Sequence, residues 1–173
     1  CHDEKTKKRI DFLKNFGFAG EITVIAPGIN AKMNELQAAY GLLQLKRIDS
    51  YIARRKEIAE LYRKELSGIK GIRLLNDIEG VNHSYTYFPI LVDESLYVES
   101  RDSLYERLRK NNIYGRRYFY PLISDFPTYR GLPSAKPENL PISRQISEKV
   151  ICLPMYSELE RNIVYKIKNI IQK

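Results

Sequence analysis

Several residue types are scarce in this chain of 173 residues, and each shortage excludes a class of protein. The chain has no tryptophan, two cysteines and two histidines. Cys1 and Cys152 are too few and too far apart for the disulfide framework of a small secreted domain. His2 and His83 lie outside any Cys/His ligand spacing, so we expect no metal site. No apolar run reaches the ~18 residues of a membrane helix, so we expect no membrane partner.

Glycine and proline are also sparse, at nine and eight residues, which excludes collagen-like and low-complexity chains. Hydrophobic residues make up 43% and charged residues 29%, the proportions of a globular protein. Lys and Arg number 29 against 21 Asp and Glu, so the formal net charge is +8 and the pI is near 9.4. This length predicts one domain, or one domain with part of another.

The amino terminus begins with Cys1 and continues in a charged segment, without the apolar region of a signal peptide. Three interpretations stay open: a processed chain, a lipid-anchored protein that starts at cysteine, and a fragment of a longer protein. Cys152 lies in an apolar run over residues 150–153, where a buried, unreactive thiol is expected. A reducing, cytoplasmic location fits this cysteine usage best.

Apolar spacing predicts three helices in the first 66 residues. We expect them over residues 3–16, from Lys32 along a stripe that begins at Met33, and over residues 48–66. Residues 18–30 contain Gly20, Pro27 and Gly28, which predict a loop with a short strand near residues 22–25. Because no sheet accompanies these helices, residues 1–66 are interpreted as an incomplete unit.

The remaining residues, 67–173, alternate β-prone and helical segments and predict a small α+β unit with a mostly antiparallel sheet. Strands are expected over residues 72–75, 84–92, 114–120 and 151–153, and helices over residues 100–111, 142–150 and from a capping box at Ser157 onward. Pro89 predicts an edge position or a bulge for its strand.

Tyrosines and arginines are interleaved between Tyr114 and Tyr120, a composition that can stack bases and bind phosphates. The alternative is an ordinary strand with two different faces. Positive charge is spread over the whole chain and does not form one stripe, so nucleic acid is the less favoured partner. A non-enzymatic basic binding module is kept as the alternative function.

Gly28 and Asn30 directly precede a predicted helix. An asparagine there can donate its amide to an anion, because helix N-termini point backbone N–H groups outward. It can also serve as a turn or capping residue, and the sequence alone favours this second role.

The segment from Gly28 to Leu45, GINAKMNELQAAYGLLQL, resembles the DegT/DnrJ/EryC1/StrS family of sugar aminotransferases. The matching segments that follow in family order are Ile48-Asp49, Ala53–Arg55, Asn82–Tyr85, Tyr118–Leu122, Leu140-Pro141 and Leu153-Pro154. The resemblance covers essentially all of this chain and about the C-terminal half of a family member. It implies an α+β or α/β fold. Residues 1–66 would then close a fold-type-I large domain with long connecting helices, and residues 67–173 would form the small domain.

The resemblance also implies a function. The family depends on pyridoxal phosphate, works as homodimers, and moves an amino group from glutamate to a keto sugar carried on a nucleoside diphosphate. Its Schiff-base lysine lies upstream of the position of Cys1, and Lys14, which precedes Asn15-Phe16-Gly17, does not match that motif. No catalytic residue is therefore assigned, and this chain alone is expected to be inactive.

Some binding roles follow from the resemblance residue by residue. Asn30 matches the asparagine that reaches across the dimer to the cofactor phosphate, and Lys32 matches a basic residue near the same interface that can meet a phosphate. The expected sugar-pocket residues are His83 and Tyr85 on one strand and Arg116, Tyr118 and Tyr120 on the next. For each of them a packed or solvated side chain is the alternative.

Overall fold

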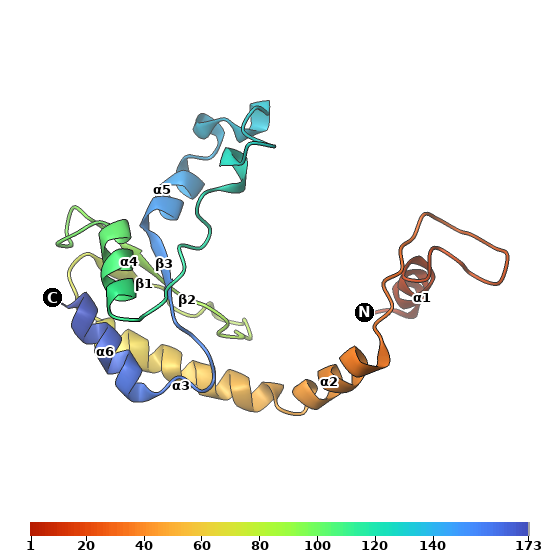
Figure 1. Cartoon of the computed structure of the whole chain (residues 1–173), viewed down its shortest axis with the longest axis horizontal. Helices are drawn as coiled ribbons and strands as arrows, with labels where there is room; N and C mark the ends of the chain where they lie inside the picture. The colour runs from red at the N-terminus through yellow and green to blue at the C-terminus, as the bar shows by residue number, and fades with distance from the viewer. Residues whose placement is uncertain (173) are drawn as a thin grey trace. The chain divides into compact units, whose positions relative to one another are not determined.

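The computed structural model describes residues 1–172 and divides the chain into two compact units, Cys1–Ile48 and Asp49–Lys173 (Figure 1). The sequence places the division after Leu66. The packing places it earlier, because helix α3 (Ile48–Leu66) buries Ile58, Tyr62 and Leu66 in the core of the second unit. The assignment of residues 1–66 to a large domain stays a prediction. Within residues 1–172, no helix is both long and apolar enough to span a bilayer.

The first unit contains helices α1 (Glu4–Leu13) and α2 (Glu35–Leu45). The side chain of Asp3 caps α1 by accepting from the Thr6 N–H, and Asn34 forms a capping box with Gln37 at the start of α2. The expected extension of α1 to residue 16 is wrong, because the chain turns at Phe16 and Gly17, which both have positive φ. The short strand expected near residues 22–25 is reduced to one bridge between Phe18 and Val24.

Two glycines allow the ends of the connecting loop to meet. A Cβ atom on Gly28 would lie 2.3 Å from the Gly17 nitrogen, so only glycine fits there. Backbone hydrogen bonds from Phe16 N–H to the Ile29 carbonyl (3.1 Å) and from Ala31 N–H to the Lys14 carbonyl (2.9 Å) close the loop. This closure pairs Asn15 with Asn30, a few residues before α2.

The second unit is built on an antiparallel sheet in the order β1-β2-β3, formed by β1 (Ile72–Leu74), β2 (Phe88–Val92) and β3 (Val150–Leu153). Its helices are α3, α4 (Arg101–Lys110), α5 (Pro141–Lys149) and α6 (Arg161–Ile171), with short 3₁₀ turns at Ile123–Asp125, Pro133–Ala135 and Pro137–Asn139. One core of buried side chains joins the strands to α3, α4 and α6, and Figure 1 shows these helices beside the sheet. The predicted α+β class is confirmed.

Two predicted strands are shorter than expected. Residues 84–87 stay outside β2, and Tyr85 there adopts a left-handed conformation with φ of 50°. Residues 114–120 form no strand, and within them Arg116 makes a single bridge to Cys152. Both segments have β-prone composition, but neither has a neighbouring strand to pair with along its length.

Pro89 lies on the central strand, so the expected edge position is wrong. β1 ends at Leu74 opposite Ile90, so no residue of β1 lies beside Pro89. On the other side Pro89 faces Cys152. The Cys152 N–H donates to the Arg116 carbonyl at 2.7 Å, and the Cys152 carbonyl accepts from the Arg116 N–H at 2.9 Å. Pro89 and Cys152 therefore form a non-hydrogen-bonded pair, and the missing N–H of proline costs no ladder bond.

The last helix also starts later than its capping signal predicts. The Ser157 hydroxyl bonds the Glu158 carboxylate (2.7 Å), and α6 begins at Arg161 without a side-chain cap. At the other helix predicted to carry a serine cap, α4, the expectation is confirmed, because Ser100 accepts from the Ser103 N–H.

Candidate functional site

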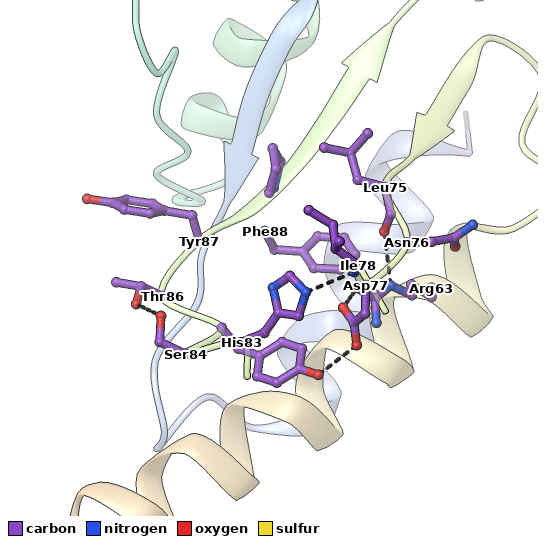
Figure 2. Close-up of a pocket in the computed structure, with 12 residues that line it drawn as sticks. Arg63, Leu75, Asn76, Asp77, Ile78, His83, Ser84, Thr86, Tyr87 and Phe88 are labelled. Carbon is purple, nitrogen blue, oxygen red and sulfur yellow. Dashed lines mark hydrogen bonds and ion pairs between the residues drawn. The ribbon is translucent and has the colours of Figure 1, made fainter. Parts of the chain in front are cut away.

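A pocket of about 360 Å³ lies in the second unit, where residues 75–78 after β1 meet residues 83–89 at the start of β2 (Figure 2). Arg63 of α3 contributes the third wall. Of the residues expected at a sugar pocket, the structure brings His83 and Tyr85 together here. Their rings lie 5.8 Å apart, with a tilt of 45° between the planes.

The carboxylate of Asp77 is the centre of the polar contacts in this pocket. One oxygen pairs with the Arg63 guanidinium at 2.5 Å, and the other accepts from the Tyr85 hydroxyl at 2.6 Å. The hydrogen bond from Tyr85, and then the Arg63 charge, lower the pKa of Asp77. The same bond to Asp77 raises the pKa of Tyr85, because the phenol proton is held by the carboxylate.

His83 is held by the backbone of the same loop. Its Nε2 accepts from the Ile78 N–H at 2.9 Å, which leaves Nδ1 as the nitrogen that can donate. The adjoining Ser84 carbonyl accepts from the Arg55 guanidinium at 2.9 Å, which ties the segment to α3. Both contacts fix the orientation of the 83–85 segment at the pocket.

Tyr118 reaches the edge of this pocket through an aromatic contact. Its ring stacks on the pocket-lining Tyr87 with centroids 4.6 Å apart, and the Tyr87 hydroxyl donates to the Tyr118 hydroxyl at 3.3 Å. Phe119 stacks on the Tyr118 ring at 3.8 Å. Tyr118 is not itself a lining residue, but it contacts one from a segment distant in sequence.

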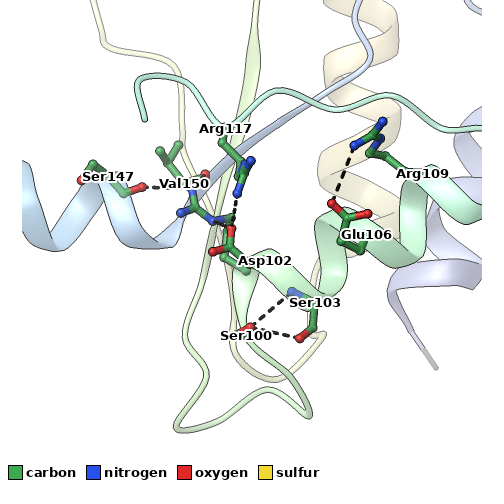
Figure 3. A network of polar contacts seen from close by, with 9 residues as sticks. Ser100, Asp102, Ser103, Glu106, Arg109, Arg117, Ser147 and Val150 are labelled. Carbon is green, nitrogen blue, oxygen red and sulfur yellow. Dashed lines mark hydrogen bonds and ion pairs between the residues drawn. The ribbon is translucent and has the colours of Figure 1, made fainter. Parts of the chain in front are cut away.

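A second polar network, drawn in Figure 3, includes Asp102, Arg117, Ser147 and Val150. The Tyr120 ring lies beside it. Arg101 is buried, donates to the carbonyls of Ser147 and Val150 at 3.0 Å each, and lies 4.7 Å from the Tyr120 ring centroid. Nearby, Arg117 pairs with Asp102 at 3.0 Å. This network joins α4 to α5 and β3, and the exposed Tyr120 ring lies against its arginine.

Arg116 contributes its backbone to the sheet bridge with Cys152, and its side chain is exposed. The structure does not bring it into the pocket lining around His83 and Tyr85.

The remaining predicted residues lie in the first unit. Asn30 is exposed directly after the glycine closure. Lys32 donates its ammonium to the Asn15 side chain at 2.9 Å and lies 5.0 Å from the Phe16 ring centroid. The amide of Asn30 and the ammonium of Lys32 are thus presented on a loop that the backbone holds in place.

Sequence reasoning missed Arg63 and Asp77. Arg63 resembles any charged residue on an exposed helix face, and Asp77 lies in a loop without a motif. They are separated by 14 positions, and only the path of the chain joins their side chains.

Comparison with known proteins matches residues 1–172 to the DegT/DnrJ/EryC1/StrS aminotransferase family, and the chain belongs to this family. The resemblance seen in the sequence is confirmed. A dTDP-4-amino-4,6-dideoxy-D-glucose transaminase of Escherichia coli is 54% identical over 98% of this chain and 45% of its own length. The chain thus spans about half the length of the curated relatives it matches.

Solved structures give the same result. DesI, crystallised in the presence of its TDP-sugar product, is 28% identical with a TM-score of 0.88 over 98% of this chain and 43% of DesI. The sugar aminotransferase Spr1654 of Streptococcus pneumoniae in its PLP form is 25% identical, with a TM-score of 0.83 over 99% of this chain and 44% of Spr1654. A PMP form of Spr1654 matches as well. The expected cofactor of the family, pyridoxal phosphate, is confirmed.

The residues of this chain suit one part of that cofactor. Asn30 and Lys32 carry N–H donors, which are the groups that bind phosphate oxygens. The Lys32 ammonium already has an amide oxygen and an aromatic face as neighbours, so it is held close to Asn15. The donor set therefore fits the cofactor phosphate, and the lysine that bonds the cofactor has no match in this sequence.

Proposed function

We propose that this chain is the C-terminal part of a pyridoxal-phosphate-dependent aminotransferase that acts on a nucleotide-linked keto sugar. The observation that carries the proposal is 54% identity to the Escherichia coli transaminase over nearly the whole chain. The substrate is accordingly a dTDP-linked 6-deoxy sugar with a keto group at carbon 4, and glutamate is the amino donor. A homodimer and a cytoplasmic location are parts of the same proposal.

Each group in this chain has a binding role in the proposal. Asn30 holds the cofactor phosphate across the dimer, and Lys32 adds a positive charge near the same phosphate or that of the nucleotide. Pyridoxal phosphate, when bound, supplies the electron sink for moving the amino group. His83 and Tyr85 contact the sugar, and Tyr118 closes the pocket edge on Tyr87. Arg116 and Tyr120, although predicted as sugar contacts, lie outside that pocket lining and are not assigned this role.

A chimaera tests the proposal. The C-terminal segment of the Escherichia coli transaminase is replaced by this chain, which leaves the relative's own N-terminal region in place. We expect the chimaera to bind pyridoxal phosphate and to aminate the dTDP-linked 4-keto-6-deoxy sugar with glutamate. A folded chimaera that binds the cofactor but leaves this sugar unchanged would contradict the proposed substrate.

The 173 residues alone are not expected to transaminate, because none of their lysines matches the cofactor lysine of the family. Treatment with pyridoxal phosphate and borohydride should label no single lysine stoichiometrically. The Escherichia coli transaminase is the positive control. Stoichiometric labelling of one lysine in this chain would disprove the expectation.

The alternative function, a basic module that binds nucleic acid, gains no support from a specific contact. Arg117 pairs with Asp102, and Tyr118 stacks between Tyr87 and Phe119. These side chains make contacts within the protein, whereas Tyr114, Phe119 and Tyr120 of the same segment are exposed. Titration with single-stranded DNA at several salt concentrations distinguishes the two functions, because phosphate binding falls steeply with salt.

A further inference from the structure

The geometry points to Asp77 as a specificity-determining residue. Its carboxylate makes the Tyr85 hydroxyl a hydrogen-bond acceptor, and the pocket thereby selects a sugar hydroxyl over a phosphate. The inference rests on the proposed function, since it takes the pocket around His83 and Tyr85 as the sugar site. It adds Asp77 and Arg63, which contact each other at 2.5 Å, to the residues that determine what binds there.

The first step concerns the proton of Tyr85. A phenol has one proton to donate, and Tyr85 donates it to Asp77 at 2.6 Å. Only the lone pairs of its oxygen remain for a ligand, so the ligand group that meets Tyr85 must be a donor. A sugar hydroxyl or an amino group can donate, whereas a fully ionised phosphate oxygen cannot.

His83 has the opposite polarity. Its Nε2 accepts from the Ile78 N–H at 2.9 Å, so its Nδ1–H is the group left to donate. The two rings line the same pocket with centroids 5.8 Å apart. A hydroxyl group both donates and accepts, so it satisfies Tyr85 and His83 together. The ligand class is therefore a pyranose carrying hydroxyl or amino groups.

Arg63 makes this arrangement stable. Its guanidinium balances the Asp77 charge and donates a further bond to the Leu75 carbonyl at 3.1 Å, so the carboxylate is anchored to α3. Tyr85 has a φ of 50°, a conformation that costs energy for a residue with a side chain. The bond to Asp77 helps to hold Tyr85 in that conformation with its hydroxyl aimed at the carboxylate.

The test uses the whole enzyme, assembled as the chimaera described above. In Asp77→Asn we expect the KM for the nucleotide sugar to rise about five- to ten-fold, the effect of one hydrogen bond. The kcat, the KM for glutamate and inhibition by dTDP alone should stay unchanged. Tyr85→Phe should raise the sugar KM by a similar factor. In the double variant the sugar KM should rise no more than in the more affected single variant.

Asp125→Asn is the matched control, because Asp125 also pairs with an arginine, Arg144, at 2.8 Å but lies outside this pocket. It should leave every constant unchanged. If Asp77 had a merely structural role, the variant would show both weaker inhibition by dTDP and a higher sugar KM. That result would overturn the inference. An unchanged sugar KM in Asp77→Asn would overturn it as well.

A second measurement separates this inference from the proposed function. If the chimaera does not turn over the sugar, the proposed function fails, and NMR of the 173-residue chain still decides the role of Asp77. Asp77→Asn should move the titration of the Tyr85 phenol to lower pH, because Asp77 raises the pKa of Tyr85. His83 is one of only two histidines, so its imidazole signals are easily assigned.

Methyl glucopyranoside and inorganic phosphate are the two probes in that NMR experiment. The glycoside should shift the Tyr85 and His83 signals, and phosphate should not. The opposite pattern, or an unmoved Tyr85 titration in Asp77→Asn, would overturn the inference whatever the enzyme assay shows.

Discussion

At the scale of single residues, burial determines the chemistry of Cys152. The sequence predicts a buried, unreactive thiol in an apolar run, and the structure confirms that Cys152 is buried while Cys1 is exposed. Burial raises the pKa of the Cys152 thiol to about 11, and the nearby Arg116 charge opposes this only in part. The thiol therefore keeps its proton at neutral pH in the folded chain.

This pKa leads to the first prediction. In a Cys1→Ser variant, Ellman's reagent should not label Cys152 at about pH 8 until urea unfolds the chain. The unfolded thiol ionises near its ordinary pKa, whereas the folded thiol ionises only near 11. This residue therefore stabilises the fold below pH ~9, and that contribution is lost as the pH rises to 11. Cys152→Ala, compared over the same pH range, should lack this loss. Rapid labelling of the folded Cys1→Ser variant would contradict the prediction.

Only some of the polar residues of the pocket could be predicted from the sequence. His83 and Tyr85 are found from a family resemblance, because they lie in one short matching segment. Arg63 and Asp77 carry no local signal, since an arginine on a helix and an aspartate in a loop are common everywhere. Only the approach of α3 to the loop after β1 brings the two charges to 2.5 Å.

At the scale of elements, Gly71 determines how β1 begins. It has a φ of 81°, and a Cβ atom there would lie 2.4 Å from the Tyr97 nitrogen. Its carbonyl accepts from the Asp93 N–H at 2.8 Å, which joins the start of β1 to the end of β2. Any side chain would meet backbone atoms in a conformation that disfavours it.

We therefore expect Gly71→Ala to lower the free energy of unfolding by about 2 to 3 kcal/mol. Urea unfolding followed by circular dichroism measures the change. Gly131→Ala is the control, because an added Cβ meets nothing within 4 Å and φ is not positive there. It should change the free energy of unfolding by less than about 0.5 kcal/mol. Equal effects of the two substitutions would show that the close approach to Tyr97 is not the cause.

Helix α2 is apolar yet has no buried residue. The exposed apolar side chains on it are Leu36, Tyr40, Leu42, Leu43 and Leu45. The capping box and the apolar stripe make the helix predictable from sequence, but they do not say what covers it. An exposed apolar helix of this kind favours association.

We expect the 173-residue chain to self-associate and to bind an apolar dye. The double variant Leu36→Glu/Leu43→Glu should shift it towards a monomer in size-exclusion chromatography with light scattering. Ile142→Glu, at a position of α5 that is 74% exposed, is the matched control and should leave association unchanged. A monomeric parent chain without dye binding would contradict the prediction.

At the scale of the whole molecule, the two units differ in how much they bury. Every member of the core cluster lies in the second unit, from Ile58 of α3 to Ile171 of α6. In residues 1–48, Gly17 is the one residue classed as buried. The second unit therefore has the apolar core that a stable domain needs, and the first does not.

A chain of residues 49–173 should accordingly fold alone. We expect a single cooperative urea transition with a midpoint close to that of the whole chain, since the core cluster is retained. Residues 1–48 alone should show no cooperative transition. Loss of cooperativity in residues 49–173 would show that the first unit is needed for folding.

Features that depend on local interactions could be predicted directly from the sequence. The helix over residues 48–66, the Ser100 cap and the family to which the chain belongs were all readable there, because each depends on neighbouring residues. The tertiary structure alone decided which β-prone segments became strands, why Pro89 fits the central strand, and which charge meets Tyr85. A strand needs a partner and a pocket needs side chains from distant segments, and both depend on contacts between residues far apart in the chain.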